Sequence, residues 1–160
     1  MRLPAFRFGF TLIEMMVVIA ISGILVAGGL AAYKGISEKE NLKQAGLTLE
    51  SNLKLAARRA QAGEKPGDCS GSLTSFTVSA GTDNTKYQVQ ALCSQQNAAA
   101  VEYVLGDGIQ FQQVFTTPID LLPLRNGVTG GQTLTLTTIS GSFSYQVVVE
   151  ASGVIRGGLL

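Results

Sequence analysis

The feature that most constrains this chain is an apolar run near its start that holds a single carboxylate. Between Phe10 and Ala32 the only ionisable side chain is Glu14. The run matches the roughly 20 apolar residues that a helix needs to cross a bilayer, so the sequence predicts a transmembrane helix over residues 10–32. A carboxylate there costs about 2.5–3.5 kcal/mol on insertion scales, and such a residue is expected to have a partner or a function. The partner of Glu14 must come from outside the run.

A short basic leader, residues 1–9, precedes the run. It contains Arg2 and Arg7, and cations on this side favour a cytoplasmic N-terminus with the bulk of the chain outside. An ordinary secretory signal is cleaved after its apolar region, so cleavage removes that region. Here the obvious small residue, Gly9, comes before the run. Cleavage after Gly9 would keep the helix on the mature chain and would create a new amine on Phe10.

The residues at this junction resemble a known signal. Gly-Phe-Thr-Leu-Ile-Glu at residues 9–14, followed by the apolar run, resembles the class III signal of type IV pilins and type II secretion pseudopilins. The resemblance implies that a prepilin peptidase cleaves between Gly9 and Phe10 and that Phe10 is N-methylated. It also implies that Glu14 contacts the Phe10 amine of an adjacent subunit in a filament. The expected partners are then other pilin or pseudopilin subunits, the processing enzyme and the inner membrane. The alternative is an unprocessed single-span anchor with an incidental Glu14.

Composition argues against an enzyme or a metal protein. The chain has 160 residues, which leaves room for one domain beyond the anchor, and it contains no histidine and two cysteines. These residues offer no histidine base, no cluster with metal-ligand spacing and no Gly-x-Ser-x-Gly elbow. Two of the 12 basic residues lie in the leader, so the mature chain carries 10 against 11 acidic residues, which is no nucleic-acid-binding excess. We therefore expect a non-enzymatic protein without catalytic, metal-binding or cofactor-binding residues.

Beyond the apolar run the helical pattern continues over residues 33–62 and becomes amphipathic. Apolar residues recur mostly at spacings of three and four, which predicts one buried face. They are Ile36, Leu42, Ala45, Leu49, Leu53, Ala56, Ala57 and Ala60. The charges between them, such as the i,i+4 pair of Glu50 and Lys54, suit a solvated face. The Gly28-Gly29 pair lowers helix propensity and favours a local bend or a melted turn, and Gly63 is expected to help end the helix.

Residues 63–160 are predicted to form a β-rich globular domain. Alternating patterns predict a hairpin from residues 73–80 and 86–93. Further strands are expected at residues 101–105, 109–115, 133–139 and 142–151, whereas residues 116–131 form the least regular stretch and a candidate contact surface. The predicted fold class is α+β, with the amphipathic half of the long helix packed on a small, mostly antiparallel sheet.

The two cysteines, Cys69 and Cys93, flank the predicted hairpin. Outside the cytoplasm a pair of cysteines favours a disulfide, and closing a loop of this size contributes roughly 3 kcal/mol if the geometry permits. Free buried thiols are the alternative.

The soluble part also resembles a narrower group. The segment Val101–Phe111, a loop with proline and glycine, the strand 133–136 and the closing segment Val147–Arg156 are similar in order to pseudopilin H and the fimbrial T minor pilins. Together with the class III signal, this resemblance covers nearly the whole chain and implies a pilin-like fold.

That group implies three functional hypotheses. The protein is a minor pseudopilin near the tip of a type II secretion filament, where it helps to initiate assembly or meets secreted cargo, or it is a minor or major pilus subunit for adhesion or motility. Both place it first in the inner membrane and then in a periplasmic or surface filament. The third hypothesis is DNA capture through a basic Gly-Arg-x-Arg tail, of which this chain keeps only Arg156. Arg125 and Lys86 are further cations that could add to it, but nothing in the sequence indicates that they are its neighbours. Nonspecific DNA binding generally needs several phosphate contacts and one arginine offers about one, so the sequence favours the first two hypotheses.

Overall fold

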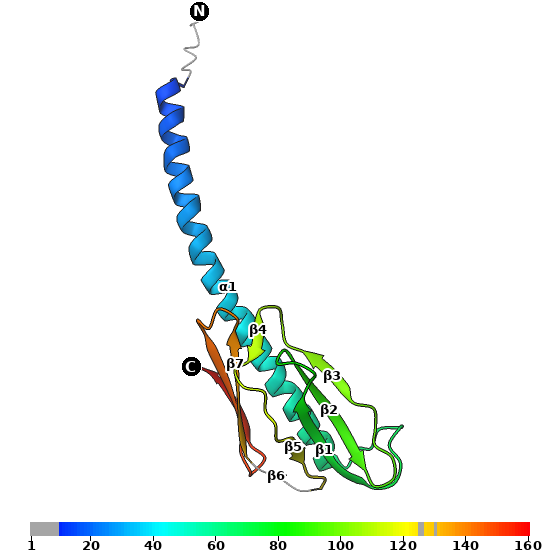
Figure 1. The fold of residues 1–160 in the computed structure, drawn as a ribbon. Helices are drawn as coiled ribbons and strands as arrows, with labels where there is room; N and C mark the ends of the chain where they lie inside the picture. Colours follow the sequence, from blue (N-terminus) through cyan, green and yellow to red (C-terminus); the bar gives the residue numbers. More distant parts are fainter. Residues whose placement is uncertain (1–9, 125–126, 130) are drawn as a thin grey trace, which may run out of the picture. The chain divides into compact units, whose positions relative to one another are not determined.

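The computed structural model describes residues 10–124, 127–129 and 131–160 (Figure 1). They form a long helix, α1 (Leu12–Ala62), and strands arranged in two antiparallel sheets. The strands are β1 (Leu73–Ala80), β2 (Lys86–Cys93), β3 (Val101–Val104), β4 (Ile109–Phe111), β5 (Ile119–Leu121), β6 (Val128–Thr129), β7 (Gln132–Thr138), β8 (Ser144–Val149) and β9 (Ile155–Leu159). The chain divides into two compact units, one ending at Ser37 and the other running from Glu38 to Leu160, and α1 contributes to both.

The end of α1 is fixed by a glycine, as the sequence predicts. Gly63 has φ of 62°, a left-handed conformation that costs glycine little. The Gly63 N–H donates to the carbonyl of Ala60 at 2.9 Å, and the Glu64 N–H donates to the carbonyl of Arg59 at 2.9 Å. These two bonds form a Schellman motif, which satisfies carbonyls that the last turn would otherwise leave unpaired.

The predicted Gly28-Gly29 interruption is not present as a melted turn. α1 is helical from Leu12 to Ala62 and includes both glycines. Backbone hydrogen bonding along the helix therefore continues through a position where glycine lowers intrinsic propensity by about 1 kcal/mol per residue.

The first sheet has the strand order β3-β2-β1-β5-β6. Its centre is the predicted hairpin of β1 and β2, whose bounds agree with the sequence pattern and whose register pairs Val78 with Val89. β5 pairs antiparallel with the other edge of β1, opposite Phe76 and Val78. The side chains of Phe76, Val78 and Ile119 are all buried, so alternate residues of this sheet supply one layer of the core.

The second sheet has the order β4-β7-β8-β9. β7 and β8 form its centre, with Leu136 opposite Tyr145 in the register. Alternation is clear in β8, where Tyr145, Val147 and Val149 are buried and the residues between them are partly exposed. This period of two orients one face of the sheet toward the core.

The C-terminal part of α1 supplies the residues on which both sheets pack (Figure 1). The predicted helix positions Leu42, Leu49 and Leu53 are fully buried, and they belong to one apolar cluster with residues of both sheets. The predicted α+β fold, with a long helix packed on antiparallel β structure, is therefore confirmed. Ile36, which the periodicity also placed on the buried face, is 69% exposed and belongs to the first unit.

The division into two sheets differs from the single sheet that was expected. The chain moves from the first sheet to the second after β3, returns for β5 and β6, and crosses again before β7. The two sheets are connected by backbone hydrogen bonds. In one of them the N–H of Phe111, in β4, donates to the carbonyl of Asn84, between β1 and β2, at 2.8 Å. Residues 116–131 were expected to be irregular, but they contain β5 and β6. Both strands are too short to show a period, and they are ordered because β5 pairs with β1 and β6 pairs with β5.

Candidate functional site

The N-terminus of α1 is closed by two reciprocal hydrogen bonds between Thr11 and Glu14. The Glu14 N–H donates to Thr11 Oγ1 at 3.3 Å, and the Thr11 N–H donates to Glu14 Oε2 at 3.4 Å. This is a capping box, in which an N-cap hydroxyl and a carboxylate three residues later satisfy backbone donors of the first turn. Glu14 is an acidic residue in the first turn, where carboxylates stabilise helices. Glu14 thus holds the helix start in place within one chain.

The surface that follows Glu14 is apolar on all sides. Between Phe10 and Val26 the large apolar side chains are each at least 51% exposed. Consecutive residues such as Met15, Met16 and Val17 point in different directions around a helix, so no single face of this part of α1 is covered by the rest of the described chain. A helix that is hydrophobic all round requires an apolar environment. Within residues 10–124, 127–129 and 131–160, no helix combines the length and the apolarity needed to cross a membrane.

The residues of the predicted processing and assembly site lie together at this end of the chain. Phe10 is 78% exposed and directly precedes the capping box, and the Glu14 side chain is exposed at the first turn. Gly9, the predicted residue before the cleaved bond, lies outside the described residues.

Comparison with known families identifies the same segment. Residues 6–30 match the prokaryotic N-terminal methylation motif. This match spans the predicted cleavage point, the predicted methylation site at Phe10 and the carboxylate of Glu14. The match supports a type IV pilin-like protein. No solved structure matches the chain.

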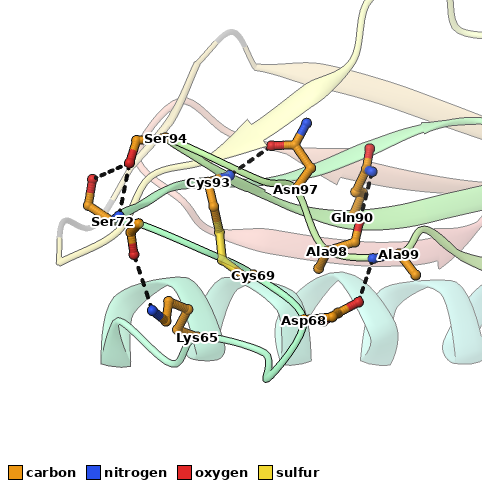
Figure 2. Close-up of a disulfide and its surroundings, with 11 residues drawn as sticks. Lys65, Asp68, Cys69, Ser72, Gln90, Cys93, Ser94, Asn97, Ala98 and Ala99 are labelled. Carbon is orange, nitrogen blue, oxygen red and sulfur yellow. Dashed lines mark hydrogen bonds between the residues drawn. A yellow bond between two sulfur atoms is a disulfide. The ribbon is translucent and has the colours of Figure 1, made fainter.

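The two cysteines of this pilin-like protein form the predicted disulfide (Figure 2). Cys69 and Cys93 have a Cα–Cα separation of 5.9 Å, and both are buried. The bond joins the segment after α1 to the end of β2, so it closes the hairpin of β1 and β2 against the helix terminus.

Hydrogen bonds support the same junction independently of the disulfide (Figure 2). The Ala99 N–H donates to Asp68 Oδ2 at 2.7 Å, and the Cys93 N–H donates to Asn97 Oδ1 at 2.9 Å. Between the residue before β1 and the residue after β2, the Ser72 N–H donates to Ser94 Oγ at 3.0 Å. These contacts satisfy backbone donors in turns that regular sheet pairing does not reach.

Arg156, the predicted DNA contact, is engaged within the chain. Its guanidinium pairs with the carboxylate of Glu150, and the hydrogen bond from Arg156, followed by one from Ser152, lowers the pKa of Glu150. Lys86, which could have added a second cation, pairs with Glu102 at 3.0 Å. The two cations therefore face carboxylates of their own chain. Arg125, another cation considered for DNA, lies outside the described residues.

The capping box is the part of the site that sequence reasoning missed. Its signal is the Thr-x-x-Glu spacing of residues 11–14 immediately before an apolar run, which is a recognised mark of a helix start. The apolar run around Glu14 by itself indicates only that its carboxylate needs a partner from another molecule.

Proposed function

We propose that this pilin-like protein is a minor subunit of a type II secretion or type IV pilus filament, similar to pseudopilin H and fimbrial T. The observation that carries the proposal is the coincidence of the methylation motif at residues 6–30 with a helix that is apolar on every side. The second support is a separate α+β unit with its own core, from Glu38 to Leu160, which remains available for contacts after the helix is packed.

In this proposal the first part of α1 is held in the inner membrane, with the leader in the cytoplasm, until the subunit joins a filament. Prepilin peptidase cleaves after Gly9, and the new amine of Phe10 is methylated. The amine of an adjacent subunit then becomes a cationic partner for Glu14. A bond between an ammonium group and a carboxylate is charged on both sides, whereas the bond that the Thr11 N–H donates at 3.4 Å is charged only on the acceptor side, so the former is the stronger of the two. Assembly therefore stabilises a carboxylate that is costly in lipid.

DNA capture is not favoured by the contacts of the body. Arg156 is paired with Glu150 and Lys86 with Glu102, so DNA phosphates would have to compete with carboxylates already bound to these cations. We therefore propose other pilin or pseudopilin subunits, and secreted cargo in a secretion filament, as the partners.

The role of Glu14 is tested by the substitution Glu14→Ala in cells that assemble the filament. We expect normal cleavage and membrane recovery but at least about ten-fold lower incorporation into sheared filaments, because a lost charge-assisted bond of about 1.5–3 kcal/mol corresponds to a factor of ten or more. The matched control is Glu40→Ala, which removes a carboxylate from an exposed i,i+3 pair with Lys43 elsewhere on α1 and should leave incorporation normal. Equal incorporation of both variants would contradict the assembly role.

Processing is tested separately by intact-mass measurement of the protein purified from the membrane. The proposal requires a chain that begins at Phe10 and carries one added methyl group. A purified chain that begins at Met1 would contradict the processing step even if the protein were found in a filament.

A further inference from the structure

The second unit has a strand edge next to α1 that is left unpaired. β3 is the terminal strand of the first sheet and pairs with β2. The Leu105 N–H donates to the Thr85 carbonyl at 2.8 Å, so residues 105 and 85 form a hydrogen-bonded pair in this register. Such pairs alternate along an antiparallel ladder. The backbone N–H and C=O groups of Glu102 and Val104 therefore point away from β2, toward an edge on which no strand of the described chain pairs.

A groove of ≈ 370 Å³ lies between this edge and the helix. α1 contributes Asn41, Gln44, Ala45 and Thr48 to its lining, and the end of β3 and the turn after it contribute the segment from Val104 to Asp107. The buried side chains of Tyr87 and Ile109 also line the groove. The groove thus combines uncharged hydrogen-bonding side chains on a helix with a free strand edge. An extended peptide recognised by strand addition uses this combination of main-chain bonds and side-chain contacts.

The charge at one end of the groove is acidic. A second hollow of ≈ 390 Å³ shares Asn41, Asp107 and Ile109 with the first and adds Glu38 to the lining. Glu38 Oε2 accepts a hydrogen bond from Ser140 Oγ at 3.0 Å, which holds the carboxylate beside the turn after β7. Among the described residues, Asp107 and Glu38 are the charged residues in the two linings, and these linings contain no lysine or arginine. This end of the groove is complementary to a cation.

The β3 edge also exposes apolar side chains. Val104 is 66% exposed and Val101 is 52% exposed, whereas Tyr103 between them stacks on Tyr87 with ring centroids 5.2 Å apart. An open strand edge with exposed valines readily pairs with another chain unless something covers it. A partner strand would satisfy the free backbone groups, and its side chains would pack beside Val101 on one face of the sheet and beside Val104 on the other.

We propose that the groove between α1 and β3 binds an extended basic segment of another protein, which adds a strand to the β3 edge and places a lysine or arginine beside Asp107 and Glu38. The site goes beyond the proposed filament role, because it lies in the body of the protein and requires neither cleavage after Gly9 nor the contact of Glu14. The occupant is defined by its chemistry: an extended backbone, alternating apolar side chains and a terminal cation.

The test uses the full chain in detergent and a short fluorescent peptide of alternating valine and threonine with a lysine at each end, followed by fluorescence anisotropy. We expect saturable binding that weakens with added salt. Asp107→Asn and Glu38→Gln should each weaken binding by about three- to five-fold, as expected for loss of a partly exposed ion pair. The matched control is Glu40→Gln, which makes the same change of charge on α1 outside both linings and should bind the peptide as the unmodified chain does.

Two further peptides separate strand addition from general attraction. A peptide with a central proline cannot donate the required backbone hydrogen bond and should not bind. A peptide with glutamate in place of both lysines should bind at least about three-fold more weakly.

The proposal is overturned if no saturable binding occurs, if either of these two peptides binds as tightly as the first peptide, or if Asp107→Asn does not change the binding. Light scattering that showed copies of this chain associating through β3, and dispersing on Val104→Lys, would also overturn it by assigning the edge to a second copy. None of these outcomes bears on processing at Gly9 or on incorporation through Glu14, so failure here is distinguishable from failure of the filament role.

Discussion

Gly46 lies where α1 comes closest to the ring of Tyr145. A Cβ atom built at this position would overlap the ring atoms of Tyr145, which is itself buried in β8 and bonded to Glu50 through its hydroxyl at 3.4 Å. Gly46→Ala gains about 1 kcal/mol of helix propensity but forces the ring or the helix to move. We expect a net loss of about 1–3 kcal/mol in the free energy of unfolding, as found for overpacked cores. Urea unfolding of the full chain in detergent measures it, with Gly67→Ala as the control because a Cβ at Gly67 meets no atom within 4 Å. Equal stability of the two variants would contradict this account of the contact.

Individual residues differ in how far the sequence predicts their environment. Leu42, Leu49 and Leu53 follow from helical spacing alone and are fully buried. The need for glycine at position 46 does not follow, because it depends on a tyrosine 99 residues later in the chain. The exposure of Ile36 has a similar origin, since periodicity shows which face a residue occupies but not where the covering sheets end.

The disulfide acts at the scale of elements, because it ties the end of α1 to the end of β2. It closes a loop with a sequence separation of 24. Replacing both Cys69 and Cys93 by alanine should lower the free energy of unfolding by about 3 kcal/mol, chiefly through the larger conformational freedom of the unfolded chain. The hydrogen bond from Ala99 to Asp68 should keep the folded junction in place. Urea unfolding with and without reductant measures the effect, and reductant should destabilise the unmodified chain while leaving the double variant unchanged. A double variant as stable as the oxidised chain would refute the contribution.

Elements with a strong local signal were predicted well. The bounds of β1 and β2 agree with the alternating pattern of residues 73–80 and 86–93. β5 was not predicted, because it has three residues and pairs with β1, which is distant in sequence. β9 was not predicted although its partner β8 directly precedes it, because a five-residue segment with two glycines shows no alternation. The separation into two sheets was missed because local alternation contains no information about which strands pair.

At the scale of the whole molecule, the candidate site and the fold differ in how they are encoded. The proposed processing and assembly site is a contiguous segment, residues 9–14, so all the residues that define it can be found in the sequence. Only the capping role of Thr11 was missed. The groove beside β3 is assembled from α1, β2, the turn after β3 and β4. No local pattern predicts a groove of this kind, because its lining depends on which strand is left at the edge of the sheet.

The titratable groups of the whole chain predict a flat stability plateau around neutral pH. The chain has no histidine and both cysteines are in the disulfide, so its side chains offer little that titrates between the carboxylates and the tyrosines. Hydrogen bonds from Thr85, Lys86 and Arg156 lower the pKa values of Asp83, Glu102 and Glu150, respectively. The stability they contribute is present above the unfolded values of 3.8 and 4.5 and is lost as the pH falls through the lower folded values.

The alkaline side of the plateau is set by two buried phenols and by Lys86, whose pKa is raised by its hydrogen bond to Glu102. Burial raises the pKa values of Tyr87 and Tyr145 above 10.0, so their contribution is complete below pH 10.0 and is lost as the pH rises through the folded values. We expect the free energy of unfolding of the full chain in detergent, measured by urea titration, to be constant between about pH 6 and 9 and to fall above pH 10.

Tyr87→Phe should lower this constant free energy of unfolding by about 1 kcal/mol, because the Asn52 amide loses the hydroxyl that accepts its hydrogen bond at 2.7 Å. The same variant should make the alkaline decline shallower, because one buried phenol no longer ionises. A stability maximum near pH 7, or an alkaline decline as steep in Tyr87→Phe as in the unmodified chain, would show that other groups control the pH dependence.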